Sequence, residues 1–215
     1  MAPEISLPTR LFLLAYHPDK KRLTNWSHLG AVLRAAALAE LAFEGYVADE
    51  NGRVVVRQHG HSARTPTDPV LRTLLDEIAA SSKPRKWEHW AGRRNTAFVK
   101  LVREQLAAEH LIKAERQRLI GLIPYWEITL RDTRTRTRLA ENARRTLRGG
   151  EPVDRIDRRD AAVVALAANG ELKIVVSGAD KRAYKKRIEA LAEQVGPVVR
   201  GLRKAVQAAQ AAAAS

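Results

Sequence analysis

An arginine and a tryptophan near the start of one long predicted helix are the residues best suited to bind an anionic ligand. The pattern predicts a helix from Ser27 to about Glu44, with Trp26 just before it and Arg34 on its otherwise apolar face. An unpaired guanidinium among Leu and Ala side chains costs several kcal/mol, so Arg34 needs an anionic partner. Trp26 offers a flat apolar ring with a polar edge, which suits a membrane–water boundary. The structural alternative is a core tryptophan and an arginine whose head reaches solvent along its stem.

A run of cations with interleaved tryptophans follows in the segment 83–103. One acid, Glu88, stands against seven basic residues, and two tryptophans lie among them. The basic residues are Lys83, Arg85, Lys86, Arg93, Arg94, Lys100 and Arg103, and the tryptophans are Trp87 and Trp90. This mixture is expected where a protein attracts anionic headgroups and inserts aromatic rings into the membrane interface. It suits single-stranded nucleic acid equally, because bases stack on aromatic rings while cations follow the backbone.

A second basic surface is predicted on the helix that follows Leu130. At 100° per residue its arginines fall on one side and its apolar residues on the other. The arginines are Arg131, Arg134, Arg138, Arg145 and Arg148, opposite Leu139, Ala143 and Leu147. The alternative is the solvated face of an ordinary amphipathic helix.

Signals of catalysis or of a bound metal are weak. The sequence has no Gly-rich phosphate loop, no nucleophile elbow and no His-Glu-x-x-His motif. His59 and His61 are close in sequence, but a polar loop explains them better than a metal site. Glu40, in the long apolar helix, is either an acid with a raised pKa or, more often for such a residue, a partner for a buried arginine or a cap. We therefore expect a non-enzymatic protein without metal or cofactor.

The overall charge limits the class of partner. The 215 residues contain 38 Lys and Arg against 24 Asp and Glu, a net charge of +14. Such a chain is attracted to nucleic acid, anionic membrane surfaces or acidic proteins. The sequence has no cysteine, no recognisable secretory signal and no run of the ~18 apolar residues that span a bilayer. These features predict a cytoplasmic protein that is soluble or peripherally bound to a membrane.

The pattern predicts a mainly α fold: a compact, multi-helix single domain with one or two small β-hairpins. The domain is expected over residues 1–204, followed by an Ala/Gln-rich tail over 205–215 that frays. Predicted helices include 7–16, a helix capped by Thr67 or Asp68 that ends near 80, a helical segment over 87–112 broken near Gly92, a basic helix over 179–194 and a last helix from 198. Hairpins are predicted over 46–57, around Asn51-Gly52, and over 111–130, turning near 115–117.

Three blocks of sequence resemble the Golgi phosphoprotein 3 family, and the chain is identified as a bacterial-type member. The first block is the Leu-rich run from Ile5 to Tyr16, and the third spans Thr65 to Ile78. The second block is a spaced set that follows the family pattern: Trp26, Leu33-Arg34, Leu38, Glu40-Leu41-Ala42 and Gly45. Weaker similarity continues to Thr129, so the resemblance covers most of the chain.

The resemblance implies a peripheral membrane protein that binds phosphatidylinositol 4-phosphate. In the family, the headgroup pocket combines the tryptophan and arginine of the second block with two basic residues on a later helix. Trp26 and Arg34 match the first pair in type, with one residue fewer between them. The second pair falls on Thr96 and Val99, and Arg93, Lys100 and Arg103 lie within about a turn as substitutes. A hairpin over 112–130 mediates self-association in the family, whereas here it could equally pack only on its own domain.

The leading prediction is thus an adaptor that binds anionic phospholipid and carries a client membrane protein. The alternative is a nucleic-acid-binding regulator, because the order helix, helix, hairpin over 87–130 is similar to a winged-helix unit. Against this alternative, the second of these helices ends in Glu104 and Glu109 and has no evident set of base-reading side chains.

Overall fold

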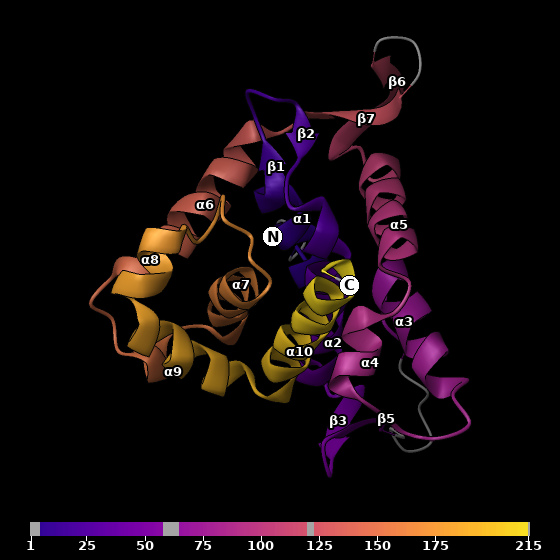
Figure 1. Cartoon of the computed structure of the whole chain (residues 1–215), viewed down its shortest axis with the longest axis vertical. Helices are drawn as coiled ribbons and strands as arrows, with labels where there is room; N and C mark the ends of the chain where they lie inside the picture. The colour runs from indigo at the N-terminus through magenta and orange to yellow at the C-terminus, as the bar shows by residue number, and fades with distance from the viewer. Residues whose placement is uncertain (1–4, 58–64, 120–122, 215) are drawn as a thin grey trace.

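Helix α2 (Trp26–Phe43) forms the centre of the molecule, and the other elements are arranged around it (Figure 1). The computed structural model describes residues 5–57, 65–119 and 123–214. Every residue of α2 from Leu29 to Leu41 is buried. A helix that is apolar around nearly its whole circumference must be enclosed on all sides, and the many alanines of α2 let its neighbours approach closely.

In the described part of the chain, six helices surround α2. They are α1 (Leu7–Ala15), α3 (Pro69–Ala79), α4 (Trp87–Gly92), α5 (Asn95–Ala108), α7 (Arg158–Asn169) and α10 (Pro197–Ala213). Helix α5 approaches α2 closely at Gly30, where an added Cβ would clash with the backbone carbonyl and the Cβ of Asn95. A side chain at position 30 would therefore push the start of α5 away from α2.

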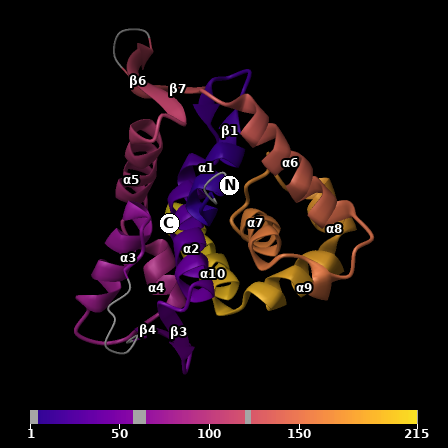
Figure 2. The ribbon, with the colours of Figure 1, turned by 180° about the vertical axis from the view of Figure 1, so that it is seen from behind.

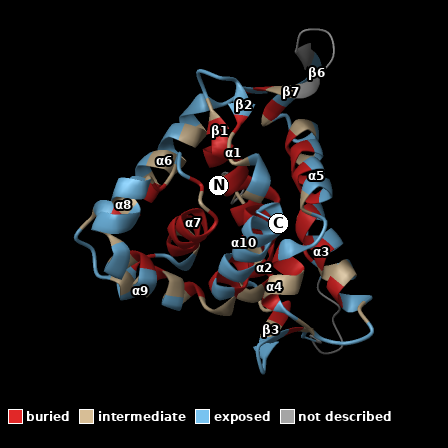
Figure 3. Ribbon diagram, viewed as in Figure 1, coloured by how far each residue is buried: buried red, intermediate tan, exposed pale blue. Residues whose placement is uncertain are grey.

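Helices α3, α4 and α5 lie on one side of α2, and α6 (Thr133–Arg148), α8 (Gly178–Ala183) and α9 (Lys185–Val195) lie on the other (Figures 1 and 2). A short 3-10 helix, η1 (Val153–Arg155), connects α6 to α7. Buried residues concentrate in α2 and α7, and exposed residues cover the outer helices (Figure 3). Helix α10 covers part of α2 and exposes its other face.

Three small antiparallel sheets complete the described part of the chain. The strands β3 (Val47–Glu50) and β4 (Arg53–Val56) form a hairpin that β5 (Arg85–Lys86) extends. Asn51 and Gly52 both have positive φ, of 52° and 76°, as the two-residue turn of a hairpin requires. The strands β6 (Ile112–Leu119) and β7 (Ile123–Leu130) form a second hairpin that projects from the helices (Figure 1), and β1 (Tyr16–His17) pairs with β2 (Arg22–Leu23).

The structure confirms the mainly α class and both predicted hairpins. It also confirms the cap at Asp68, whose carboxylate accepts hydrogen bonds from the backbone N–H groups of Val70 and Leu71, with Pro69 in the first turn of α3. The break in the segment 87–112 lies between α4 and α5, as expected near Gly92.

Four boundaries differ from the sequence predictions. Helix α2 begins at Trp26 rather than after Ser27, because Asn25 in the left-handed region turns the chain into the helix. The strand β6 runs through Leu119, so residues 115–117 pair with β7 and do not form the turn. The basic segment 179–194 is two helices that meet at Tyr184. The segment expected as a loose tail continues α10 through Ala213, and Val206 is buried.

Candidate functional site

The anionic partner of Arg34 lies inside the protein. Its Nη2 donates to Oε2 of Glu77 at 2.7 Å, and its Nε donates to the backbone carbonyl of Trp90, also at 2.7 Å. The guanidinium also stacks over the ring of Phe98, with its Cζ atom 4.9 Å from the centroid, and the residue is only 1% exposed. Burial lowers the pKa of Arg34, and the hydrogen bond to Glu77 opposes that shift. Arg34 is therefore closed off from a headgroup in this structure, and its contacts tie α2 to α3 and α4.

The two tryptophans expected at a membrane surface are core residues instead. Trp87 is 4% exposed, and its Nε1 donates to Oδ1 of Asp49 at 2.5 Å. Trp90 is 2% exposed and stands edge-to-face with His89. Both rings point inward because α4 has one buried face that packs against α10. An added Cβ on Gly201 of α10 would lie 2.6 Å from Trp87 Cβ. The prediction of an interfacial role for these rings is wrong, and they anchor α4.

The basic residues predicted on α5 are also engaged within the protein. Arg103 is buried and stacks on Trp126 of β7, with its Cζ atom 3.6 Å from the ring centroid, and burial lowers its pKa. Lys100 is exposed and lies 3.7 Å from Glu104, one turn along the helix. At the two positions where the family resemblance expects cations, Thr96 is exposed and Val99 is buried. Arg103 therefore fixes the β6–β7 hairpin on α5 and is not available to a membrane surface.

A hollow of about 610 Å³ gathers the other cations of the predicted patch with residues that are distant in sequence. We call it the basic hollow. Its walls come from the β4–β5 edge, the outer face of α4, the start of α5 and the C-terminal half of α10. It is lined by Arg53, Arg85, Lys86, Glu88, His89, Gly92, Asn95, Lys204, Ala205, Ala208 and Ala209. Four Lys and Arg side chains thus face one carboxylate.

Two uncharged side chains of the basic hollow add hydrogen-bonding groups. The Oδ1 atom of Asn95 is buried and has no hydrogen-bond partner in the described part of the chain. Burial lowers the pKa of His89, and the positive charges of Arg85, Arg93 and Arg34 lower it further. His89 is therefore neutral near pH 7 and can donate one ring N–H.

Trp26 is the sequence-predicted aromatic residue that does lie at the surface. It is 53% exposed at the first position of α2. It precedes Gly30 by about one turn, and Gly30 abuts Asn95 of the basic hollow. Arg93 and Arg94 are exposed in the link between α4 and α5, and Lys83 is exposed in the loop before β5. Arg93 and Arg94 thus lie between two residues that line the basic hollow, Gly92 and Asn95, whereas Trp26 and Lys83 are not among its lining residues.

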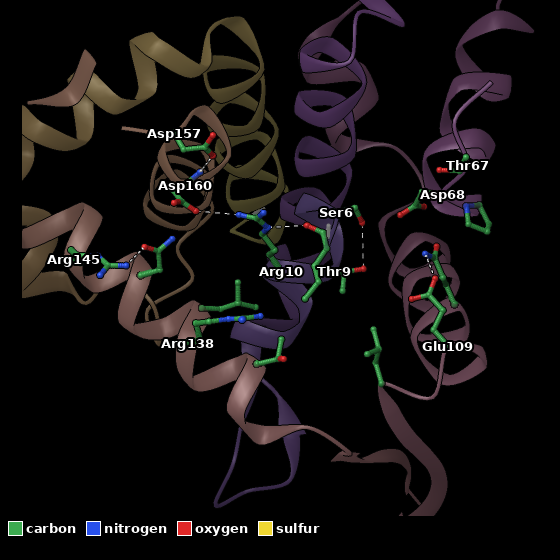
Figure 4. Close-up of a pocket in the computed structure, with 17 residues that line it drawn as sticks. Ser6, Thr9, Arg10, Thr67, Asp68, Glu109, Arg138, Arg145, Asp157 and Asp160 are labelled. Atoms are coloured by element: carbon green, nitrogen blue, oxygen red, sulfur yellow. Dashed lines mark hydrogen bonds and ion pairs between the residues drawn. The ribbon is translucent and has the colours of Figure 1, made fainter. Parts of the chain in front are cut away.

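A larger groove of about 1010 Å³ lies on another part of the molecule, between α1, α3, α5, α6 and α7 (Figure 4). Its charged side chains largely satisfy one another or cap helices. Arg10 is 3.1 Å from Asp160, Asp68 and Asp157 cap α3 and α7, and Glu109 accepts from Gln105 at 2.8 Å. The groove therefore offers no concentrated charge of one sign for a headgroup.

Glu40 has the structural role expected for it. It is 1% exposed, accepts a hydrogen bond from the backbone N–H of Leu7 at 2.6 Å, and pairs with Arg159 at 2.5 Å. It thereby caps α1 and ties α2 to α7. His59 and His61 lie outside the described residues, and within the described ranges no three His, Cys, Asp or Glu side chains cluster as metal ligands.

Sequence reasoning missed seven residues of the basic hollow, three alanines of α10 and four polar or charged residues: Arg53, His89, Asn95 and Lys204. Lys204 follows the buried Leu202 on an amphipathic helix, so its exposure was predictable from periodicity. Its position beside α4, more than a hundred residues earlier in the chain, was not predictable from any local signal.

The comparisons with known proteins agree with the resemblance found in the sequence. The family model for Golgi phosphoprotein 3 (GPP34) matches residues 7–209, which is nearly the whole chain. No individual curated protein gives a significant match. Among residues 5–57, 65–119 and 123–214, no helix is both long enough and apolar enough to cross a bilayer. The match over 7–209 shows that this chain belongs to the Golgi phosphoprotein 3 family.

Proposed function

We propose that this protein binds anionic phospholipid headgroups at the cytoplasmic face of a membrane and acts there as a peripheral adaptor. The observation that carries the proposal is the basic hollow, where Arg53, Arg85, Lys86 and Lys204 converge against the single acid Glu88. Phosphatidylinositol 4-phosphate is the headgroup that family membership favours. The proposed function is binding alone and includes no catalytic step.

The charges support reversible attachment. Each Lys or Arg close to an anionic membrane contributes about 1 kcal/mol, and four line the hollow. Exposed Arg93 and Arg94 lie next to it in the chain and add to the attraction. Trp26, half exposed at the start of α2, supplies an apolar ring with a polar edge for the interfacial region. Electrostatic attraction combined with one aromatic anchor favours association that salt can reverse.

The contacts of Arg34 support a role in positioning the site rather than direct contact with a headgroup. By bonding the carbonyl of Trp90, Arg34 holds the helix that carries His89 and Glu88. A phosphate monoester needs several convergent donors, and the hollow offers guanidinium and ammonium groups from β4, β5 and α10. We therefore assign Arg34 to positioning the site and assign the headgroup contacts to Arg85, Lys86 and Lys204.

An adaptor also needs a protein client, and we propose a membrane protein in that role. The β6–β7 hairpin, which projects from the helical body (Figure 1), is the proposed contact for self-association. Its attachment to α5 through Arg103 and Trp126 holds it in a defined direction.

The test is co-sedimentation with vesicles of phosphatidylcholine alone or with phosphatidylserine, phosphatidylinositol or phosphatidylinositol 4-phosphate, at two salt concentrations. The double variant Arg85→Glu with Lys204→Glu should lose at least tenfold in affinity for vesicles with phosphatidylinositol 4-phosphate. The matched control, Arg134→Glu with Arg138→Glu on α6, makes the same change in net charge and should retain selectivity. Equal losses in both variants would show that only net charge matters and would refute the site.

The same samples test the nucleic-acid alternative. The order α4, α5, β6–β7 hairpin is present, as a winged-helix unit requires. However, Arg103 is buried and Lys100 is paired with Glu104, so α5 offers little to a duplex. Tight, salt-dependent binding of duplex DNA, without lipid selectivity, would favour that alternative over the proposed function.

A further inference from the structure

A second hollow, of about 500 Å³, lies along α10 on the side away from the basic hollow. At 100° per residue, Val199, Arg200 and Arg203 fall on one side of α10, whereas Ala205, Ala208 and Ala209 fall on the other. The opposite wall comes from α8 and α9 (Figure 1). The lining residues are Asn169, Lys181, Arg182, Lys185, Ile188, Glu189, Ala192, Glu193, Val199, Arg200 and Arg203. We call this the α9–α10 hollow.

The base of the α9–α10 hollow is apolar and its edge is cationic. Ile188 and Val199 are buried in its base, and Ala192 is half-buried between them. The five Lys and Arg side chains of the edge are all exposed, and they come from both walls: three from the α8–α9 wall and two from α10. Glu189 and Glu193 are the two acids, which leaves a net charge of +3.

The five cations make no polar contact that stabilises the fold in the described part of the chain. Within the part of the chain that the structure describes, none of them forms an ion pair or a side-chain hydrogen bond. Nearby arginines are engaged: Arg148 pairs with Asp180 at 2.8 Å, and Arg187 donates to the carbonyl of Thr146 at 2.8 Å. Cations held together without acidic partners repel one another, so this arrangement favours an anionic ligand.

An apolar base under a ring of cations is complementary to an amphiphile with one anionic head. Pockets of about 300–1,000 Å³ with apolar walls and few polar groups are typical of small-molecule sites. The net charge of +3 matches a phosphate monoester, which carries about −1.5 to −2 near pH 7, better than a carboxylate. Arginine from each wall can bind phosphate oxygens in the paired geometry that guanidinium allows.

We propose that the α9–α10 hollow binds one single-chain alkyl phosphate, of the lysophosphatidate type, with its chain against Ile188, Ala192 and Val199 and its phosphate at the cationic edge. This site is separate from the headgroup site in the basic hollow. Helix α10 forms one wall of each hollow, so a ligand in the α9–α10 hollow would contact the helix that also lines the basic hollow.

The experiment is titration calorimetry of the full chain with dodecyl phosphate below its critical micelle concentration and without vesicles. The comparison ligands are inorganic phosphate, dodecanoate and dodecyltrimethylammonium. Dodecyl phosphate should bind at least tenfold more tightly than any of them. Equal binding of inorganic phosphate would refute a role for the apolar base, and equal binding of the cationic amphiphile would refute a role for the edge.

Four variants separate this site from the rest of the surface. Arg182→Glu with Arg203→Glu should weaken dodecyl phosphate binding at least tenfold. The matched control, Lys173→Glu with Lys186→Glu, changes exposed lysines outside the hollow and should leave binding unchanged. Ala192→Phe fills the base and should also abolish chain binding, with circular dichroism used to verify folding. Loss of binding in the basic-hollow variant Arg85→Glu with Lys204→Glu, but not in the edge variant, would overturn this proposal and leave the proposed function standing.

Discussion

A buried arginine is stable only with an anionic partner, and in this structure a carboxylate of the protein itself is that partner. Arg34 was the most conspicuous cation of the sequence, and its Nη2 lies 2.7 Å from Oε2 of Glu77, 43 residues later in the chain. The argument from burial required an anionic partner for Arg34 but did not identify it, and the stated alternative, an arginine head that reaches solvent, does not occur because the residue is 1% exposed. The identity of the partner depended on how α3 packs on α2, which the residue types alone do not determine.

Removing the Arg34 side chain should therefore act on stability first. Arg34→Met leaves Glu77 without its cation and the carbonyl of Trp90 without its donor, and breaking a partly buried pair of this kind costs about 3–5 kcal/mol. We expect a fall of that size in the free energy of unfolding, measured by urea denaturation. Lys100→Met, which removes an exposed pair, should change it by about 0.5 kcal/mol or less. A folded, fully stable Arg34→Met variant that lost only lipid binding would return Arg34 to the headgroup site.

We expect His89 to make the proposed lipid binding dependent on pH, with a sign that follows from its surroundings. Burial lowers its pKa first, and then Arg85, Arg93 and Arg34 lower it further, so the free protein holds His89 neutral near pH 7. A bound anion offsets the neighbouring positive charges and raises that pKa, so protonation and binding reinforce each other. Affinity for phosphatidylglycerol vesicles, whose charge is constant in this range, should rise from pH 7.5 to pH 5.5.

The substitution that isolates this effect is His89→Gln, which should flatten the pH dependence of vesicle binding. A pH dependence of vesicle binding that persists unchanged in His89→Gln would assign it to another group.

The same lowered pKa predicts that the protein loses stability as pH falls below about 6.5, the ordinary pKa of histidine, because the unfolded chain takes up the proton first.

At the scale of elements, the basic hollow depends on the contact between α4 and α10. Gly201 allows that contact, since an added Cβ would meet Trp87 Cβ at 2.6 Å and its carbonyl carbon at 2.9 Å. Gly201→Ala should separate the two helices and lower the free energy of unfolding by about 1–3 kcal/mol, the usual cost of overpacking. Vesicle binding should weaken with it, because Lys204 moves away from Arg85.

A matched control is available at Gly178, the first residue of α8, where the nearest atom to an added Cβ is a flexible guanidinium nitrogen at 3.8 Å. Gly178→Ala should keep full stability and binding in the same urea and vesicle measurements. If Gly201→Ala behaved like Gly178→Ala, α10 could shift without cost and the hollow would not depend on this contact.

The elements themselves were largely predictable, and their contacts were not. Periodicity, the Asn51-Gly52 turn and the Asp68-Pro69 start each act within a few residues, so the sequence alone predicted these features. The inward direction of Trp87 and the stacking of Arg103 on Trp126 depend on which helix or strand lies opposite. A tryptophan between basic residues in sequence is compatible with a membrane-facing position and with a buried position. Only tertiary packing decides which of the two it takes.

At the scale of the molecule, a net charge of +14 attracts the protein to any polyanion but does not orient it. The exposed arginines of α6 lie on the side of α2 opposite α4 (Figures 1 and 2), so charge alone would allow contact through either side. The basic hollow differs from the groove beside α6 in its charge, because four Lys and Arg line it against one Glu, whereas three Arg line the groove against four Asp and Glu. This difference predicts one preferred orientation on the membrane.

The absence of cysteine from the chain makes that orientation measurable, because a single introduced thiol can carry an environment-sensitive dye. A dye at Ala208→Cys, on the wall of the basic hollow, should shift to the blue on vesicles with phosphatidylinositol 4-phosphate because it enters the interfacial region. A dye at Glu141→Cys, exposed on α6, should keep its emission in water. High salt should reverse the first shift by screening the cations that hold the hollow against the headgroups. Equal shifts at both positions would mean that the protein associates through net charge in many orientations, and the basic hollow would then have no special role in membrane binding.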